Sequence, residues 1–136
     1  MVSQLNESLI YPMFTHVILS GALYTLLTIA RAPTVWGIGA KKDGVNPWVH
    51  VEPKISANLS NQFEWPIFFY IICLLLLFNS KELGHIYIWL AWIFIFGRIA
   101  HSLVHILTSN IRLRGAVFTI NFLAVFVMWV LYVFQY

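Results

Sequence analysis

Long apolar stretches separated by short polar segments dominate this sequence. Four of them are long enough to cross a membrane: Leu9–Ala30, about Leu59–Asn79, about His85–Thr108 and Gly115–Tyr136. The last stretch contains no Asp, Glu, Lys or Arg. As a helix it would extend ~33 Å, enough for a hydrocarbon core of ~30 Å. The pattern predicts an all-α integral membrane protein, built as a four-helix up-down-up-down bundle.

The expected helices cover about 9–30, 57–79, 85–108 and 114–135, and we expect one transmembrane domain over residues 1–136. Composition agrees with this interpretation, because 60% of the 136 residues are hydrophobic and only 10% are charged. A soluble domain has roughly 25% charged residues. Cys73 is the only cysteine and lies within an apolar stretch, so it predicts a packing thiol and no disulfide.

The basic residues predict topology, and we expect no nucleic-acid partner despite the formal charge of +3. The second loop has only Lys81, whereas the first and third loops together carry Arg31, Lys41, Lys42, Lys54, Arg112 and Arg114. Because basic residues favour the cytoplasmic side, loops one and three are predicted to be cytoplasmic, with both termini on the opposite side.

Two charges of opposite sign lie inside the apolar stretches. Glu64 follows Asn61 by three residues, so both share a helix face. Arg98, His101 and His105 form a stripe on the next expected helix. Counting from the cytoplasmic ends places Asn61 level with His105 at ~5 Å depth, and Glu64 level with His101 at ~10 Å. Charges at this depth mark a site or a structural clamp, and Glu64 and Arg98 are the natural salt-bridge partners.

The remaining polar residues have simpler interpretations. His101 and His105 have a spacing that suits a metal, but the one further ligand, Glu64, is expected to pair with Arg98, so no metal site is predicted. His16 and His85 lie near expected helix ends and are predicted to be interfacial. Pro66 removes a backbone donor and frees the carbonyl of Gln62.

Arginines near the cytoplasmic ends favour an anionic, water-soluble ligand. Arginine binds carboxylates through a planar fork that forms two charge-assisted hydrogen bonds. A polar cleft would accept such a ligand from the cytoplasm while an apolar substrate enters from the lipid. The arginines concerned are Arg31, Arg98, Arg112 and Arg114.

At these residues the chain resembles the MAPEG family, the membrane-associated proteins of eicosanoid and glutathione metabolism. The second-helix pattern Arg-x-x-x-Asn-x-x-Glu, followed shortly by Pro, is matched by Asn61, Glu64 and Pro66. The third-helix pattern is matched by the run from Gly97 to His101, and a further arginine begins the fourth helix.

The resemblance implies a homotrimer in the bilayer, with glutathione as co-substrate bound between subunits and a lipophilic small molecule as second substrate. The reaction implied is a glutathione-dependent transferase or peroxidase reaction on lipophilic electrophiles or hydroperoxides. Arg112 or Arg114 would be the catalytic residue that stabilises the thiolate. The spacing from Arg98 in the prostaglandin-synthase-like pattern favours Arg114, whereas the spacing in the leukotriene-synthase-like pattern favours Arg112. The glutathione-binding residues implied are Arg31, Lys54, Asn61, Glu64, Arg98, His101 and His105.

The sequence departs from the family pattern at three positions. Ala57 and Ser60 stand where members have arginine, with Lys54 as partial replacement, and His105 stands where tyrosine is frequent. Two alternatives therefore stay open: a MAPEG-like membrane protein with another ligand or without catalytic activity, and a small transporter that uses Glu64, Arg98 and the histidines.

Overall fold

The computed structural model describes residues 4–79 and 84–135, all of whose regular structure is helical. The expected turn with Lys81 lies outside these residues. Three helices are long and apolar enough to cross a membrane, which confirms the all-α prediction. The helices are α1 (Gln4–Glu7), α2 (Ile10–Trp36), α3 (Glu52–Ser60), α4 (Pro66–Leu77), α5 (His85–Leu107) and α6 (Ile111–Val133).

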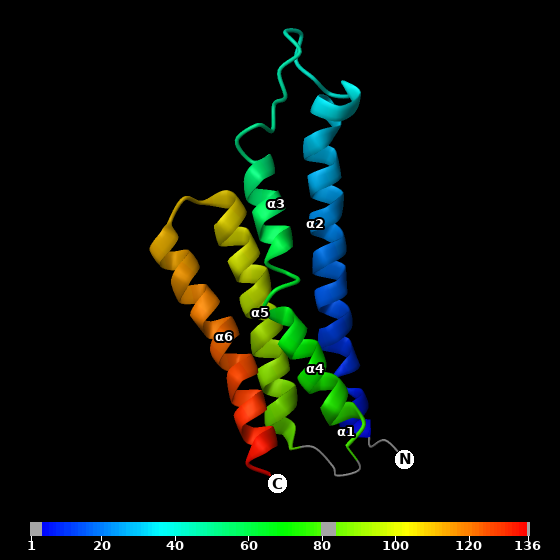
Figure 1. Ribbon diagram of the computed structural model, residues 1–136, viewed down its shortest axis with the longest axis vertical. Coiled ribbons are helices and arrows are strands. Elements are labelled where there is room, and N and C mark those ends of the chain that lie inside the picture. The colour runs from blue at the N-terminus through cyan, green and yellow to red at the C-terminus, as the bar shows by residue number, and fades with distance from the viewer. Residues whose placement is uncertain (1–3, 80–83, 136) are drawn as a thin grey trace.

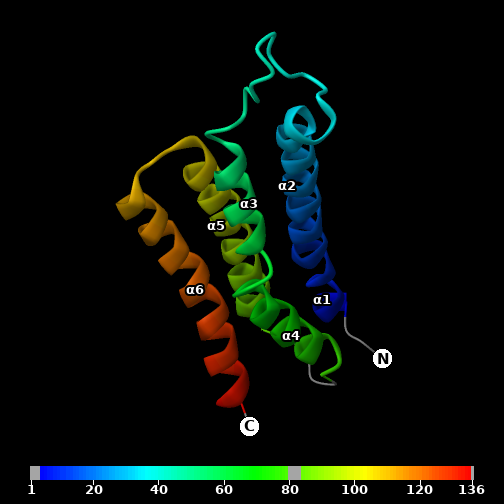
Figure 2. The same cartoon turned by 45° about the horizontal axis from the view of Figure 1, so that its top comes forward.

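The helices form an elongated structure. Helix α2 runs toward one end, α3 and α4 run back, α5 runs forward again and α6 runs back (Figure 1). Figure 1 shows α5 at the centre, with α6 on one side and α2, α3 and α4 on the other. The loop after α2 and the connection from α5 to α6 lie at one end, and α1 and the end of α6 lie at the other (Figures 1 and 2). The loops predicted to share one side of the membrane therefore lie at the same end of the molecule.

The second expected helix is divided into α3 and α4, and residues 61–65 between them are not helical. Pro66 begins α4. A proline lacks the backbone N–H, and its ring collides with the carbonyl four residues earlier, so a helix rarely continues through it. Upstream, α3 starts at Glu52, five residues earlier than expected, with a proline in its first turn. The break gives the chain an irregular segment inside the apolar part of the protein.

Helix α2 continues six residues beyond its expected end at Ala30 and includes Pro33. The loop residue Asn46 holds this last part, because its Nδ2 donates to the Ala30 carbonyl at 2.9 Å and to Thr34 Oγ1 at 2.9 Å. Gly37 then ends the helix at φ 69°, a left-handed conformation that glycine adopts without steric cost.

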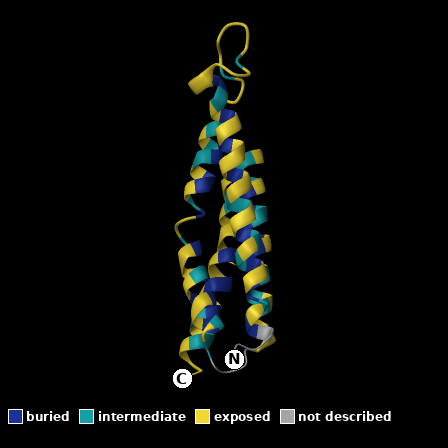
Figure 3. Ribbon diagram, turned by 90° about the vertical axis from the view of Figure 1, so that its right-hand side faces the viewer, coloured by how far each residue is buried: buried dark blue, intermediate teal, exposed yellow. Residues whose placement is uncertain are grey.

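The core is narrow and most of the outer surface is apolar. Figure 3 shows buried residues confined to the inner side of each helix. Cys73 belongs to this core as a free, buried thiol. Gly97 lets α5 approach α6 closely, because a Cβ there would overlap Asn121 Oδ1. The main cluster contains Leu9, Phe69, Ile72, Cys73, Leu76, Tyr87, Ala91, Phe94, Ile95, Ala124, Val125 and Met128.

Candidate functional site

Arg98 is fully buried and binds the helix break. Its Nη2 donates to the Asn61 carbonyl at 2.9 Å, and its Nε donates to Gln62 Oε1 at 3.2 Å. The expected salt bridge with Glu64 is wrong, since Glu64 is exposed and forms no ion pair with any residue of 4–79 or 84–135. The physical reason is the break: it frees the Asn61 carbonyl as an acceptor and turns Glu64 out of the helix face that it was expected to share with Asn61.

Gln62 is the central residue of this polar interior. Its Oε1 accepts from Arg98 and also from His16 Nε2 at 2.9 Å. Its Nε2 donates to Asn58 Oδ1 and to Ser102 Oγ, each at 3.3 Å. The Asn58 carbonyl also accepts from Nε2 at 3.3 Å, so two donors on the oxygen and three acceptors around the nitrogen fix the orientation of the carboxamide. The sequence interpretation missed Gln62 because it weighted charged residues; its position beside Asn61, four residues before a proline, was the available signal.

His16 is buried, which corrects the prediction that it lies at the membrane interface. Its side chain joins α2 to this polar interior, since Nε2 bonds to Gln62 and Nδ1 lies 2.8 Å from the Tyr70 hydroxyl. An amide oxygen only accepts, so His16 Nε2 carries the proton and Nδ1 accepts from Tyr70. His85, the other histidine predicted to be interfacial, begins α5 and is exposed.

A hollow of about 420 Å³ lies between the helix break, α5 and the start of α6; we call it the polar pocket. Its lining residues are Ala57, Asn61, His101, His105, Ile111, Arg114, Gly115 and Phe118. The rings of His101 and His105 lie 5.7 Å apart and perpendicular to each other. The Nδ1 atom of each is buried and has no hydrogen-bond partner in the described part of the chain. Both histidines line the hollow, so a ligand bound there would contact the two imidazole rings.

A second hollow of about 250 Å³ adjoins the polar pocket, with which it shares His105, Ile111 and Arg114. Lys54 lines it and donates from Nζ to the Thr108 carbonyl at 3.2 Å. None of the described residues that line either hollow is an Asp or Glu. The two hollows thus form one region that favours an anion, because clefts lined by charge of one sign concentrate counter-ions.

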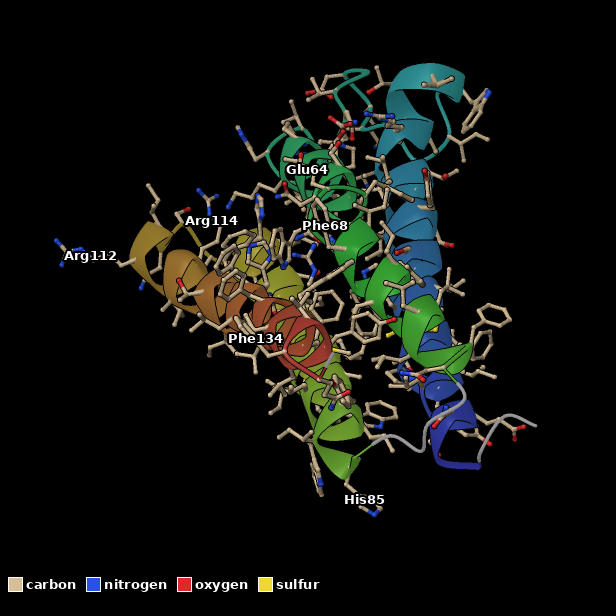
Figure 4. All side chains as sticks on the ribbon, turned by 60° about the horizontal axis from the view of Figure 1, so that its bottom comes forward. Glu64, Phe68, His85, Arg112, Arg114 and Phe134 are labelled. Carbon is tan, nitrogen blue, oxygen red and sulfur yellow. The ribbon has the colours of Figure 1, made fainter. Side chains whose placement is uncertain are left out.

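Not all of the residues predicted from the sequence meet here. The structure brings together Lys54, Asn61, His101, His105 and Arg114, with Arg98 behind them as the support of Asn61. Arg31 is elsewhere: its Nε lies 2.6 Å from Glu52 Oε1, and it lines a different hollow beside the α2–α3 loop. Glu64 and Arg112 do not line the polar pocket. Figure 4 shows Arg112 projecting outward from the start of α6, away from the other helices.

The described residues contain no group of three or more His, Cys, Asp or Glu side chains that could hold a metal ion. The polar pocket itself offers hydrogen-bonding side chains and the positive charge of Arg114. Such a site can bind an anionic ligand and stabilise a negative charge that develops on it.

Three long apolar helices are typical of an integral membrane protein, and this one has a polar pocket near one end. The model of the MAPEG family matches residues 9–134, and the chain therefore belongs to this family of membrane-associated proteins in eicosanoid and glutathione metabolism. The resemblance noted from the motifs is confirmed. No curated protein and no solved structure matches the chain significantly.

Proposed function

We propose that this protein is a glutathione-dependent transferase or peroxidase that acts on lipophilic electrophiles or hydroperoxides, with the polar pocket as its glutathione site. The observation that carries the proposal is the convergence of Asn61, His101, His105 and Arg114 on one hollow of about 420 Å³. This volume lies within the range of roughly 300–1,000 Å³ that is usual for small-molecule sites.

Glutathione has two carboxylates and a thiol, and this region offers positive charge and hydrogen-bonding groups that suit such a ligand. Lys54 and Arg114 supply positive charge at the adjoining hollow, and the two histidines and Asn61 supply hydrogen-bonding groups. Positive charge near a thiol lowers its pKa, and the thiolate is the nucleophile. In a transferase reaction the thiolate sulfur forms a bond to an electrophilic carbon; in a peroxidase reaction it attacks a peroxide oxygen.

Arg114 is the residue to which we assign the stabilisation of the thiolate. It lines both hollows and is partly buried, whereas Arg112 is exposed. A partly buried cation acts more strongly on a neighbouring anion than an exposed one, because less water screens it. Of the two arginines that the sequence left open, we therefore propose Arg114.

Because Ala57 stands where family members have an arginine, we propose that this protein binds the ligand's carboxylates more weakly than those members do. It lines the polar pocket, so the missing side chain leaves room at the wall. Lys54 lies one helical turn earlier and offers a single point charge in place of a bidentate fork. We therefore propose that Lys54 binds a carboxylate of glutathione while Arg114 acts on its thiol.

We further propose that the active form is a homotrimer in which Arg31 and Glu64 complete the site of a neighbouring copy. Support comes from the surface around Glu64, where Phe63, Ile67 and Phe68 are exposed. A carboxylate among apolar side chains at membrane depth is costly unless a partner covers it. In this assembly residues 1–136 form one transmembrane domain, α3 and α4 together supply the fourth span, and the polar pocket opens to the cytoplasm beside loops one and three.

The test is glutathione binding to the purified protein, followed by calorimetry and by the ultraviolet signal of the thiolate. The protein is compared with Arg114→Ala and with the matched control Arg112→Ala. We expect saturable binding with thiolate formation, loss of the thiolate signal in Arg114→Ala and its retention in Arg112→Ala. No binding at millimolar glutathione would refute the proposal and favour the alternative of another ligand or of a protein without catalytic activity.

A further inference from the structure

The connection between α2 and α3 carries apolar and basic side chains close together; we call residues 36–48 the surface loop. Figures 1 and 2 show it at one tip of the molecule, beyond the start of α3 and the connection from α5 to α6. None of its large apolar residues lines the hollow beside Arg31, where the proposed trimer places a neighbouring copy. These residues are Trp36, Ile38, Val45 and Trp48, which are 62%, 68%, 46% and 45% exposed.

Hydrogen bonds give the surface loop a defined turn. The Lys41 N–H donates to the Val45 carbonyl at 3.0 Å, and the Gly44 N–H donates to the Lys41 carbonyl at 2.8 Å. Asp43 Oδ1 accepts from the Val45 N–H at 3.1 Å, so this carboxylate is engaged within the turn. Gly44 adopts φ 77°, which glycine tolerates without steric cost. The turn therefore holds Lys41 and Lys42 in a fixed backbone shape.

The two lysines of the turn have their charges available to a partner. Both are exposed, and neither side chain forms an ion pair or hydrogen bond with residues 4–79 or 84–135. Asp43 is the only acidic residue of the surface loop, so two lysines against one aspartate leave a net positive charge there. A basic residue near an anionic lipid surface is attracted to it, and salt screens this attraction.

The length of α2 brings the surface loop to the level of the lipid headgroups. The helix has 27 residues and therefore extends about 40 Å. A bilayer measures roughly 40–45 Å once its headgroup regions are included. The end of α2 thus reaches the headgroups, where tryptophan is enriched because its ring has an apolar body and a polar N–H. Trp36 and Trp48 are the residues of the surface loop that suit this level.

We propose that the surface loop binds anionic phospholipids of the adjacent leaflet. Lys41 and Lys42 contact the phosphate groups, and the four apolar side chains enter the boundary between headgroups and acyl chains. Charge complementarity selects this partner, because the net positive charge of the turn favours an anionic leaflet over a zwitterionic one. The surface loop lines neither hollow of the proposed glutathione site, so this interaction does not depend on that site.

The experiment measures hydrogen–deuterium exchange of the full chain in nanodiscs of phosphatidylcholine alone or mixed with phosphatidylglycerol. We expect the amides of residues 37–48 to exchange about 5-fold more slowly in the mixed nanodiscs, the effect of one net positive charge at an anionic surface. High salt should remove this difference, because it screens exposed charges. The α5–α6 connection at the same end of the molecule reports any general effect of the lipid charge on exchange.

Substitutions in the turn test the charges in both directions. The double variant Lys41→Gln, Lys42→Gln should abolish the difference between the lipids, and Lys41→Arg, Lys42→Arg should keep it. Asp43→Asn retains an oxygen that accepts from the Val45 N–H but removes the negative charge, so it should increase the difference. Arg112→Gln is the matched control, since Arg112 is an exposed cation outside the surface loop, and it should leave the exchange of residues 37–48 unchanged.

Equal exchange of the surface loop in the two kinds of nanodisc would overturn the proposal. If that equal exchange is slow, a neighbouring copy covers the loop, and if it is fast, the loop is exposed to water. A difference that persists in the double glutamine variant would also overturn the proposal, because it would then come from the lipid charge without contact from the lysines. The exposed lysine side chains form no contacts that hold the fold, so these variants keep the test decisive.

Discussion

Arg98 donates through Nε to the side-chain oxygen of Gln62, 3.2 Å away, in a part of the molecule where both side chains are buried. A neutral amide, rather than the nearby carboxylate of Glu64, therefore holds the buried cation. Since the same guanidinium donates to the Asn61 carbonyl, Arg98 holds the first two residues of the helix break. Four predictions follow from this arrangement and from its neighbours.

Replacement of Gln62 by leucine should destabilise the protein by about 1.5–3 kcal/mol, the contribution of a hydrogen bond to a charged group. The variant leaves the Arg98 Nε without its acceptor while it keeps a side chain of similar size. Thermal unfolding in detergent measures the effect. Gln62→Glu is the control, because its carboxylate still accepts from Arg98, and it should lose less stability than Gln62→Leu. Equal loss in both variants would contradict a dominant role for the contact with Arg98.

His16→Phe should cost about 1–3 kcal/mol, because it keeps a ring but removes the hydrogen bonds to Gln62 and Tyr70. The same measurement on His85→Phe provides the comparison, since His85 is exposed at the start of α5. We expect no more than about 0.5 kcal/mol there. If His16→Phe leaves the stability unchanged while His85→Phe lowers it, the original expectation that His16 is interfacial would be restored.

Gly97→Ala should destabilise the contact between α5 and α6 by about 1–3 kcal/mol through overpacking against Asn121. The double variant with Asn121→Ala should recover most of this loss, because the Asn121 amide has no hydrogen-bond partner among the described residues. Additive effects in this double-mutant cycle would show that the two positions do not touch. Gly115→Ala serves as control, since its Cβ meets no neighbouring atom.

Arg31→Ala and Glu52→Ala remove opposite halves of one exposed ion pair at 2.6 Å. Such a pair contributes about 0–1 kcal/mol, so both variants should unfold like the parent protein. If Arg31 completes the glutathione site of a neighbouring copy, Arg31→Ala should weaken glutathione binding and Glu52→Ala should not. Calorimetry of the purified oligomer distinguishes the two; equal binding in both variants would remove Arg31 from the proposed site.

The helical class was predictable because it depends on apolar stretch length alone. A stretch such as the one that ends the chain, without Asp, Glu, Lys or Arg, has few alternatives to a spanning helix. The motif around Gly97 and Arg98 likewise identified the family, since it needs only short-range spacing. His101 and His105 were also named from the sequence, because helical spacing places i and i+4 on one face, and Arg114 was named from the family resemblance.

The partners of the polar residues were not predictable in the same way. Both Glu64 and Gln62 lie near a proline, and only the local geometry of the break decides which of them faces Arg98. His16 lies far from Gln62 along the chain, and the contact exists because α2 packs against the break. Arg112 and Arg114 differ in the face of α6 that they occupy, which spacing from Arg98 did not resolve.

The sequence by itself thus determined an all-helical membrane protein of the MAPEG family, together with the polar residues Asn61, His101, His105 and Arg114 that line the polar pocket. Hydrophobic length and i, i+4 spacing are local properties, and the local sequence specifies them. Only the tertiary structure decided that Gln62 and a backbone carbonyl hold Arg98 and that His16 is buried. These contacts join residues from separate helices, and they depend on how the break at Pro66 turns each side chain.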